Sequence, residues 1–291
     1  MNHSLVGALA ATSKLGVLGL VAGAAFSMFG LTAEPQGSAP DTKDRPHVKF
    51  RIISEHAELV PGTTETLGLV FTMEPHWHIY YKGAPGGGNP PAIEEIKLPK
   101  GYSLGEIQWP APKRYVAPGD IYDSVYEGEV TLLVPLTVPA NAKASDKPSI
   151  GLKLGWLECS DVCVFGKGED SKSLALKTDG GKPARSADAP LIDKSRAAMP
   201  APWPADGAKA EFRDGVLTIQ VTGAERLEFY PGQDSSDVKA PAESTASKSE
   251  NLTIRFEGAN KDQLTADGIL GVWRQGVSEP VYYTLKKRSS N

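Results

Sequence analysis

Cysteine is scarce in this sequence, with two residues among 291. Two sulfurs exclude a disulfide-dense scaffold and a four-sulfur zinc site, and they leave one bridge or one redox pair. Positive charge is not in excess either, because 31 lysines and arginines stand against 35 acidic residues and give a net charge of −4 without a basic block. Since binding of phosphates requires a basic surface, nucleic acid is not an expected partner.

The chain also lacks the sequence motifs of common hydrolases. A Ser-His-Asp arrangement, a phosphate loop and a zinc-hydrolase motif are all missing, so hydrolytic chemistry has no support. The 30 glycines and 23 prolines follow no period and do not reach the content of a disordered chain. A chain of 291 residues is long enough for one large or two ordinary domains.

Long hydrophobic runs are confined to the N-terminus. Residues 1–33 hold one charged side chain, Lys14, and residues 15–33 are apolar and small. This layout predicts an export signal cleaved after Ala33, with an uncleaved anchor, the one expected contact with a membrane, as the alternative. Both interpretations place the rest of the chain in the periplasm or in another exported location, where disulfides persist.

The next part of the sequence predicts strands. Residues 34–46 are polar and rich in turn formers, and we expect a flexible tether there. From residue 47 onward, apolar and polar residues alternate in short runs between glycines and prolines, as in half-buried strands. These runs fall at 48–52, 67–71, 130–136, 150–156 and 174–176. The pattern predicts an all-β protein in which residues 47–178 form an immunoglobulin-like β-sandwich.

The pattern changes after this region. Residues 179–207 contain Gly and Pro breaks around a short helical stretch at 187–199, which predicts a linker with one helix. Strand-like alternation returns in residues 208–291 and predicts a second, smaller β domain. Within that domain, residues 234–250 are rich in Ser, Ala, Lys and Glu, and we expect a mobile loop.

The two cysteines, Cys159 and Cys163, lie at the end of an expected strand. A bridge between them closes a small ring, and such a ring stabilises a fold by only about 2 kcal/mol, so stability is a weak reason for it. Small exposed rings are more typical of exchange-active disulfides. Two alternatives stay open: a structural clip that closes a turn, and a pair of sulfurs that binds a soft metal such as Cu(I).

A second chemical cluster occupies residues 73–83, with the sequence MEPHWHIYYKG. Strand alternation would place His76, His78 and Tyr80 on one face, where an imidazole or phenol can approach a thiol and lower its pKa. In one alternative, the histidines are solvated while the residues between them pack in the core. In another, Met73, His76 and His78 join the cysteines as ligands of Cu(I).

Acidic residues flank the cysteines. Glu158 precedes Cys159, and Asp161 lies between the two cysteines. Negative charge at these positions would raise the pKa of the thiols and couple exchange to protons, so both residues are expected to line the redox site.

Four segments in order resemble one family, the N-terminal periplasmic domain of the thiol:disulfide interchange protein DsbD and its copper-tolerance relatives. They are EPHWHIY at 74–80, IQWPAP at 107–112, YEGEV at 126–130 and WLECSDVC at 156–163. The joint occurrence of these segments is far more specific than any one of them. The resemblance covers most of residues 47–178, and a weaker one extends over residues 200–285.

The resemblance implies an immunoglobulin-like domain in which Cys159 and Cys163 are the redox pair, with His78 and Tyr80 beside it. It implies a cap loop that shields the disulfide, formed here by Asp123, Val125 and Tyr126 in place of the family's usual Phe tip. It also implies electron transfer from a membrane-embedded thiol donor to exported thiol–disulfide proteins, as in cytochrome c biogenesis.

No long apolar stretch follows residue 33 and no Cys-x-x-Cys unit follows residue 285, so we expect a separate membrane protein to supply the electrons. The leading hypothesis is therefore protein-disulfide reductase-type exchange without a bound cofactor. The competing hypotheses are a copper-binding or copper-tolerance module and a non-catalytic interaction sandwich with a structural disulfide.

Overall fold

The computed structural model describes residues 46–83, 85–119, 121–203, 207–260 and 263–290. The expected signal or anchor at 1–33, and the expected tether up to residue 45, lie outside these residues. Lys43–Asn291 form one compact unit. Among the described helices, none combines the length and the apolar character needed to cross a bilayer.

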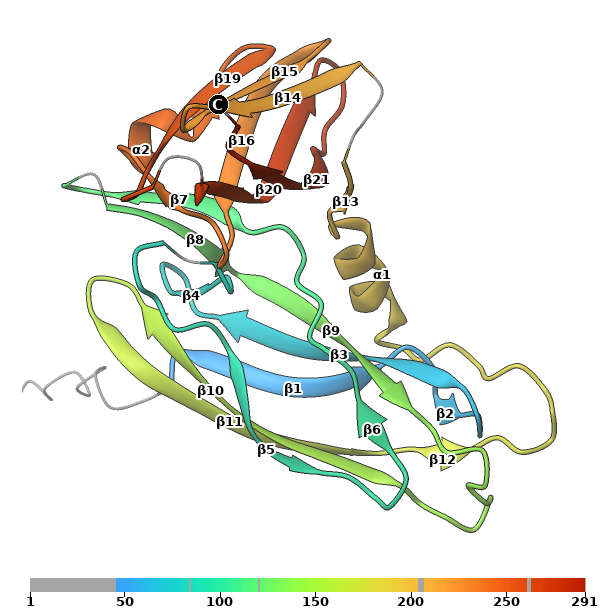
Figure 1. Ribbon diagram of the computed structural model, residues 1–291. Coiled ribbons are helices and arrows are strands. Elements are labelled where there is room, and N and C mark those ends of the chain that lie inside the picture. Colours follow the sequence, from blue (N-terminus) through green and yellow to red (C-terminus); the bar gives the residue numbers. More distant parts are fainter. Residues whose placement is uncertain (1–45, 84, 120, 204–206, 261–262, 291) are drawn as a thin grey trace, which may run out of the picture. The chain divides into compact units, whose positions relative to one another are not determined.

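Strands dominate the structure, as the alternating pattern predicts (Figure 1). One sheet of the N-terminal half has the strand order β1-β3-β9-β6, and all neighbours in it are antiparallel. Its strands are β1 (Val48–Ser54), β3 (Thr64–Met73), β9 (Glu129–Thr137) and β6 (Ser103–Leu104).

The facing sheet has the order β11-β10-β4-β8-β7, and β5 also pairs with β10. Its strands are β11 (Cys163–Ser173), β10 (Ser149–Cys159), β4 (His78–Tyr80), β8 (Ile121–Glu127), β7 (Lys113–Ala117) and β5 (Ala92–Lys97). A short parallel pair joins β2 (Glu58–Leu59) to β12 (Ala175–Leu176).

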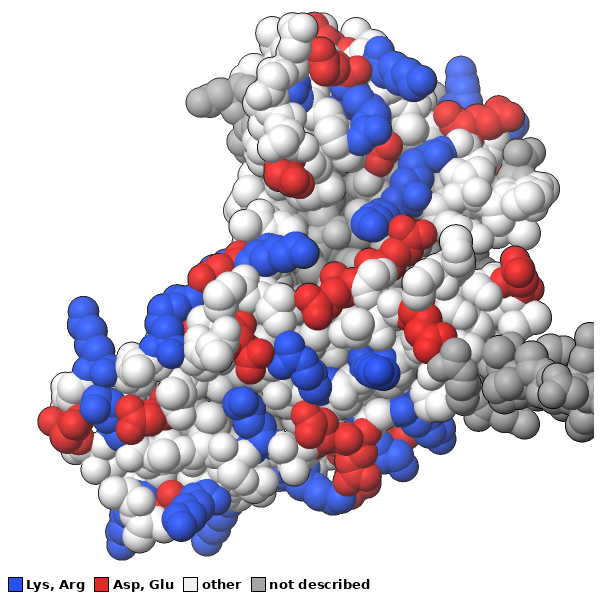
Figure 2. Space-filling model, turned by 180° about the vertical axis from the view of Figure 1, so that it is seen from behind, with Lys and Arg blue, Asp and Glu red and all other residues white. Residues whose placement is uncertain are grey.

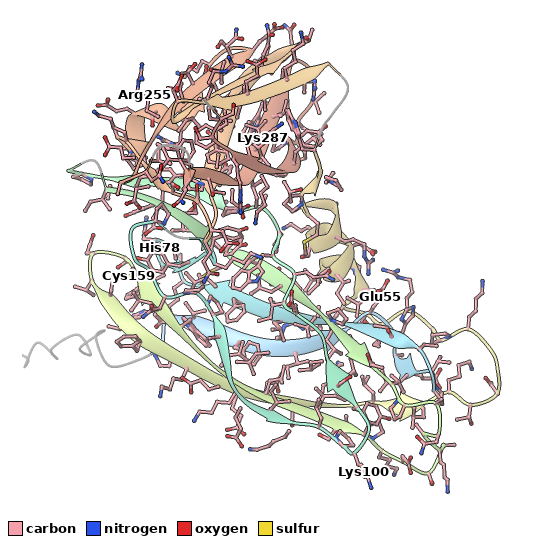
Figure 3. All side chains as sticks on the ribbon, viewed as in Figure 1. Glu55, His78, Lys100, Cys159, Arg255 and Lys287 are labelled. Carbon is pink, nitrogen blue, oxygen red and sulfur yellow. A yellow bond between two sulfur atoms is a disulfide. The ribbon has the colours of Figure 1, made fainter. Side chains whose placement is uncertain are left out.

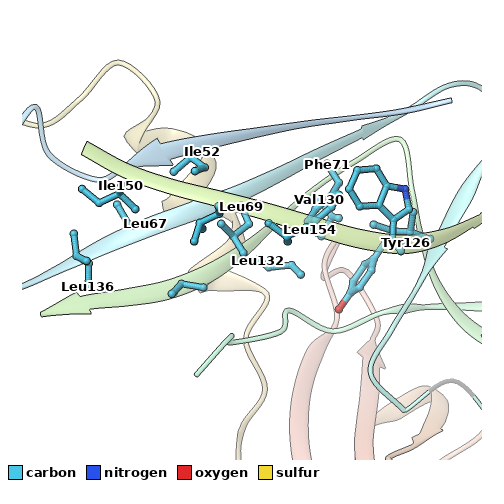
Figure 4. Close-up of a cluster of buried hydrophobic side chains, with 14 of the residues drawn as sticks. Ile52, Leu67, Leu69, Phe71, Tyr126, Val130, Leu132, Leu136, Ile150 and Leu154 are labelled. Atoms are coloured by element: carbon cyan, nitrogen blue, oxygen red, sulfur yellow. The ribbon is translucent and has the colours of Figure 1, made fainter. Parts of the chain in front are cut away.

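The two sheets enclose a shared core, which confirms the predicted β-sandwich (Figure 4). Alternate residues of β3 and of β10 are buried in it: Leu67, Leu69, Phe71, Ile150, Leu152 and Leu154. The ring of Phe71 meets the edge of Trp156 with centroids 5.2 Å apart. Aromatic contact of this kind joins the two sheets near the end of β10 that carries Cys159.

The predicted linker contains helix α1 (Ala189–Ala197), which covers the outer face of the first sheet. Pro190 lies in its first turn, where the missing amide hydrogen costs nothing. Ile192 packs in a buried cluster with side chains of that sheet, and the hydroxyl of Ser195 donates to the carbonyl oxygen of Thr131 at 2.5 Å. These contacts fix the helix on the sandwich.

The C-terminal half forms two further sheets, with the orders β13-β21-β20-β16-β18 and β14-β15-β19-β17. The strands are β13 (Ala201–Pro202), β14 (Ala208–Arg213), β15 (Val216–Val221), β16 (Ala224–Pro231), β17 (Asp237–Val238), β18 (Ala246–Ser247), β19 (Asn251–Glu257), β20 (Thr265–Arg274) and β21 (Val281–Arg288). They enclose a second hydrophobic core.

Residues 234–250, expected to be a mobile loop, contain secondary structure instead. The segment holds β17, helix α2 (Pro241–Ser244) and β18. Thr245 is fully buried, and its hydroxyl donates to the carbonyl oxygen of Pro241 at 2.6 Å. The amino-acid composition of the segment indicates solvated side chains. It does not reveal the strand pairing, in which β17 pairs with β19 and β18 with β16.

Two side chains of the C-terminal half, Tyr230 and Ile269, are buried in the same cluster as the core of the sandwich. The hydroxyl of Tyr122 in β8 donates to the carbonyl oxygen of Phe229 at 3.3 Å. Side chains of the C-terminal half therefore complete the first core.

Charged side chains are dispersed over the face shown in Figure 2, where lysines and arginines alternate with acidic residues. The described residues visible on that face do not form a continuous basic surface. This distribution is the one expected from the near balance of 31 basic and 35 acidic residues.

The core beneath the cysteines depends on a glycine. A Cβ atom at Gly166 would lie 2.2 Å from Nε1 of Trp156 and 2.6 Å from Oε2 of Glu158. We expect Gly166→Ala to lower the free energy of unfolding in urea by about 1–3 kcal/mol, because these buried groups must shift. Gly151→Ala is the control, since its Cβ first meets a lysine side-chain carbon at 3.3 Å. Equal losses in the two variants would contradict the expectation.

Candidate functional site

A hairpin of two long strands positions the cysteines. β10 ends at Cys159, β11 begins at Cys163, and the two residues are directly opposite each other in the register. The amide of Ser160 donates to the carbonyl oxygen of Val162 at 2.9 Å and closes the turn. The cysteines form a disulfide with a Cα–Cα distance of 4.1 Å. The three-residue spacing is thus the length of the turn that joins two paired strands.

The two cysteines differ in accessibility. Cys159 is 1% exposed, whereas Cys163 is exposed. Along β10 the side chains alternate between the two faces of the sheet, so Leu157 and Cys159 lie on the outer face and Trp156 lies on the core face. A partner sulfur approaching from solvent therefore meets Cys163 first.

A small buried cluster covers Cys159 on the outer face of the sheet. It contains Tyr80 of β4 and Val125 of β8, with Tyr115 and Leu157 partly buried against it. Figure 3 shows His78 and Cys159 at the same end of the sandwich. Four strands, β4, β7, β8 and β10, thus contribute the surroundings of one sulfur.

Tyr80 makes the direct polar contact with the disulfide. Its hydroxyl donates a hydrogen bond to Sγ of Cys159 at 3.0 Å. Burial raises the pKa of Tyr80 to about 12, and the nearby carboxylate of Asp123 adds to the effect. The phenol therefore keeps its proton at physiological pH and remains a donor to the sulfur.

His78 is the cross-strand neighbour of Cys159. It is buried, its Nε2 lies 3.4 Å from the hydroxyl of Tyr80, and its ring packs on Tyr115 with centroids 4.7 Å apart. Burial lowers the pKa of His78, against a smaller opposing effect of Glu127. Burial therefore favours the neutral form of the imidazole beside Cys159.

Strand alternation predicts His76 on the same strand face as His78 and Tyr80. The structure shows that this prediction is wrong. β4 begins only at His78, and the amide of Trp77 donates to the carbonyl oxygen of Glu74 at 3.0 Å in a preceding turn. His76 has a positive φ of 71° in this turn and is exposed. The turn breaks the alternation on which the expectation rested.

The segment expected to be a cap loop is a strand. Asp123, Val125 and Tyr126 belong to β8, which is paired with β4 on one side and with β7 on the other. Pairing on both sides holds the backbone extended. Val125 faces the cluster around Cys159, whereas Tyr126 faces the core of the sandwich. A shielding role for these residues stays a prediction, and Val125 has the position for it.

The carboxylate of Asp123 is buried near Tyr80. The amides of Ser124, at 2.9 Å, and Gly86 donate to it. Burial nevertheless raises the pKa of Asp123 to about 6, because these two hydrogen bonds only partly offset the loss of water. The site thus contains one acid that titrates close to neutral pH.

The glycine-rich segment at 86–88 forms part of the site. A Cβ atom at Gly88 would lie 2.0 Å from the ring of Tyr80, so the backbone packs directly on that ring. The amide of Leu157 donates to the carbonyl oxygen of Asn89 at 3.0 Å and ties the segment to β10. The run of three glycines in the sequence could have indicated this contact, because a backbone can approach a ring so closely only where it carries no side chain.

Glu158 and Asp161, expected to line the redox site, occupy different environments. Glu158 is fully buried on the core face of β10, opposite in direction to Cys159. It accepts hydrogen bonds at 2.8 Å from the amide of His47 and from Nε1 of Trp156. Asp161 is exposed in the turn between the cysteines. An effect of either charge on the thiols stays a prediction.

The alternative copper ligands are not brought together. Met73 is buried in the core of the sandwich, His76 is exposed, and His78 lies on the outer face of its sheet. Within residues 46–290, as far as they are described, no group of three or more His, Cys, Asp or Glu side chains is arranged to hold a metal ion. Copper binding at these residues stays an untested prediction.

Comparisons with known proteins agree with this geometry. Residues 50–175 match the family model described as "Thiol:disulfide interchange protein DsbD, N-terminal", which confirms the resemblance seen in the sequence. The N-terminal periplasmic domain of ScsB from Proteus mirabilis has a similar fold, with a TM-score of 0.54 and 19% identity over 85% of this chain and 96% of that one.

Other likenesses are weaker. A variant of the major pilin subunit BcpA of Bacillus cereus has a TM-score of 0.26 and 9% identity, covering 84% of this chain and 68% of that one, and it supports no inference. No curated protein matches the chain.

The hydrogen bond from Tyr80 to Cys159 can be tested by substitution. Reduction of the disulfide at Cys163 expels the sulfur of Cys159 as a thiolate, which the Tyr80 hydroxyl stabilises. We expect Tyr80→Phe to slow reduction by dithiothreitol at least about tenfold, since a hydrogen bond to a charged group contributes about 1.5–3 kcal/mol. Tyr115→Phe, whose ring packs on the same histidine, is the control. Equal rates for both variants would rule out the role assigned to Tyr80.

Burial of Asp123 predicts a specific pH dependence of stability. Its folded pKa of about 6 exceeds the unfolded value near 3.9, so its contribution to stability is full below about pH 4 and is lost as the pH rises through about 6. Relative to Asp123→Asn, the wild-type free energy of unfolding should fall by up to about 3 kcal/mol from pH 4 to pH 7. Urea denaturation at each pH measures this difference, and Asp161→Asn, a substitution of an exposed residue, is the control. If the difference between the wild type and Asp123→Asn does not change with pH, the burial argument is contradicted.

Proposed function

Since residues 50–175 form a domain of the DsbD N-terminal family, we propose that the protein is an exported, periplasmic thiol–disulfide exchange module of the reductase type. It takes electrons from a membrane-embedded thiol donor and passes them to exported thiol–disulfide proteins. The observation that carries the proposal is the asymmetry of the disulfide, with Cys163 exposed and Cys159 buried beneath Tyr80.

Delivery of electrons starts from the reduced protein. The thiolate of Cys163 attacks a client disulfide, so that a Cys163–client bond forms while the client's own S–S bond breaks and its second sulfur leaves and takes up a proton. The thiolate of Cys159 then attacks Sγ of Cys163, which closes the internal disulfide and releases the first client sulfur, again with uptake of a proton. The client gains two electrons and two protons, and this protein loses two electrons.

Reduction of the Cys159–Cys163 disulfide by the donor reverses these steps. A thiolate of the donor attacks Cys163, and Cys159 leaves as a thiolate next to the hydroxyl of Tyr80, 3.0 Å from its sulfur in the oxidised state. The donor's second thiol then breaks the mixed disulfide. Two electrons and two protons pass from the donor dithiol to this protein. The same asymmetry therefore serves both directions, because the exposed sulfur exchanges and the buried one resolves.

The bridge has little value as a structural clip. It links strands that are already paired up to the cysteines themselves, and its short loop gives about 2 kcal/mol at most. A buried hydroxyl directed at one of its sulfurs adds nothing to a clip, but it assists a leaving thiolate.

Two observations support an exported location for the protein. Residues 1–33 have the layout of an export signal. The structurally similar ScsB domain is itself described as periplasmic. An oxidising compartment also suits a protein whose two cysteines are joined.

The reduction potential of the Cys159–Cys163 pair tests the proposal. The purified chain is equilibrated in thiol redox buffers and its free thiols are counted. An exchange carrier should have a potential of roughly −180 to −270 mV, between those of oxidising and reducing exchange proteins. A pair that resists reduction below about −300 mV would be a structural disulfide, and the proposal would be wrong.

Single-cysteine variants accompany that experiment and test which of the two sulfurs exchanges. Cys159→Ser leaves the exposed Cys163 thiol, and Cys163→Ser leaves the buried Cys159 thiol. With 5,5′-dithiobis(2-nitrobenzoate), the first variant should react at least about tenfold faster, because access limits the second. Equal rates would contradict the assignment of Cys163 as the exchanging sulfur while leaving the measured potential valid.

A further inference from the structure

Strands β7 and β8, at the edge of their sheet, have two different faces. Tyr115 of β7 and Asp123 of β8 are directly opposite each other and lie on the face toward Cys159. The residues before them, Arg114 and Tyr122, point to the opposite face, because neighbouring side chains of a strand alternate. Contacts that fix Arg114 and Tyr122 therefore also fix the two residues on the side of the disulfide.

The sandwich holds this part of the two strands weakly. β4 is three residues long, and its pairing with β8 ends at Tyr80 and Val125. Among the described strands, β7 alone pairs with residues 121–124, and one further backbone hydrogen bond joins the amide of Tyr81 to the carbonyl oxygen of Ser124. Two strands paired only with each other are marginally stable in water, so other contacts must keep them in place.

The C-terminal half supplies such contacts. The hydroxyl of Tyr122, a buried residue, donates to the carbonyl oxygen of Phe229 at 3.3 Å. The guanidinium of Arg114 donates to the carbonyl oxygen of Ala242 in helix α2 and lies 5.4 Å from the centroid of the Tyr122 ring. Among the described residues, no hydrogen-bond partner reaches the buried Nε of Arg114. Because an unpaired buried donor lowers stability, stability alone is a weak reason for this arginine.

The chain that follows β4 is also in contact with the C-terminal half. A Cβ atom at Gly83 would lie 2.8 Å from Cα of Gly232 and 2.8 Å from the carbonyl oxygen of Pro231, so two backbones touch there. Gly83 is the third residue after Tyr80. The C-terminal half thus borders both elements next to Tyr80, which are β8 and the segment after β4.

We propose that the C-terminal half positions the redox site, and that Arg114 and Tyr122 are the positioning residues through which it acts. By fixing β7 and β8, these two side chains hold the hydroxyl of Tyr80 at hydrogen-bonding distance from Sγ of Cys159. The inference rests on the proposed function and adds to it a role for the C-terminal half of the chain.

The geometry at the sulfur is sensitive to the position of β8. Tyr80 is the direct cross-strand partner of Val125, so a shift of β8 shifts Tyr80 as well. A hydrogen bond weakens steeply when its angle or its length departs from the optimum. Cys159 leaves as a thiolate when the disulfide is reduced, and a displaced hydroxyl stabilises that thiolate less. The rate of reduction therefore reports on the position of Tyr80.

The test measures the rate constant for reduction of the oxidised full chain by dithiothreitol, in which two electrons and two protons pass from the dithiol to the disulfide. Tyr122→Phe removes one hydroxyl, and Arg114→Met removes the guanidinium but keeps a long apolar side chain. We expect each variant to slow reduction at least about threefold, because small displacements in a site lower rates strongly. Arg114→Lys keeps a hydrogen-bond donor and should restore part of the rate.

A double-mutant cycle with Tyr80→Phe distinguishes positioning from a general loosening of the fold. In the Tyr80→Phe background, the hydroxyl that Arg114 and Tyr122 position is absent. Tyr122→Phe and Arg114→Met should then change the rate constant by less than about 1.5-fold, since the cycle isolates the coupled part of the effect. Slowing by the same factor in both backgrounds would show that the effect does not pass through Tyr80, and the proposal would be overturned.

Arg226→Met is the matched control. The guanidinium of Arg226 lies 3.9 Å from the centroid of the Trp273 ring, and both residues belong to strands of the C-terminal half, β16 and β20. This variant loses the same kind of contact between a cation and a ring, but at a place away from β7 and β8. It should be reduced at the wild-type rate. If it is slowed as much as Arg114→Met, the assignment of Arg114 is wrong.

The remaining outcomes separate this inference from the proposed function. If Tyr122→Phe and Arg114→Met are reduced at the wild-type rate, the positioning role is wrong and the exchange function stands. If dithiothreitol does not reduce the wild type, the exchange function itself fails, and the inference that rests on it fails as well.

Discussion

Antiparallel pairing of β10 with β11 is the constraint on which the site depends. The register runs without a break from Ser149 and Ser173 to the two cysteines. Because the pairing fixes which side chains share a face, it sends Trp156 and Glu158 into the core and the cysteines outward in the same hairpin. A slip of one residue in these strands relative to the rest of the sheet would exchange the two sets and turn the sulfurs toward the core.

The two faces of this hairpin make different contacts. On the core face, Glu158 accepts hydrogen bonds from the backbone of His47 and from Trp156, which links the start of β1 to the end of β10. On the outer face, Tyr80 covers Cys159 and leaves Cys163 accessible. The hairpin thus presents one sulfur to solvent and keeps the other buried in an apolar cluster beneath the hydroxyl of Tyr80.

Sequence patterns predicted the features that depend on local order. Alternation predicted the β-sandwich and the position of Cys159 at a strand end, whereas the position of Tyr80 beside it was implied by the family resemblance. The failures have different causes. The turn before His78 is local, and it interrupts the alternation on which the expectation for His76 rested. The pairing of β8 on both sides is set by tertiary packing, which no local pattern reports, whereas the approach of Gly88 to Tyr80 had one local signal in the run of three glycines.

Tyr230 and Ile269 of the C-terminal half share a buried cluster with Tyr81 and Tyr126 of the sandwich. The sandwich is therefore not a freestanding module that can be cut from its neighbour at the linker. A fragment ending near residue 178 would expose aromatic surface that the intact chain keeps dry, and it would tend to self-associate. Transfer of the Cys159–Cys163 hairpin in protein engineering accordingly requires both halves of the chain.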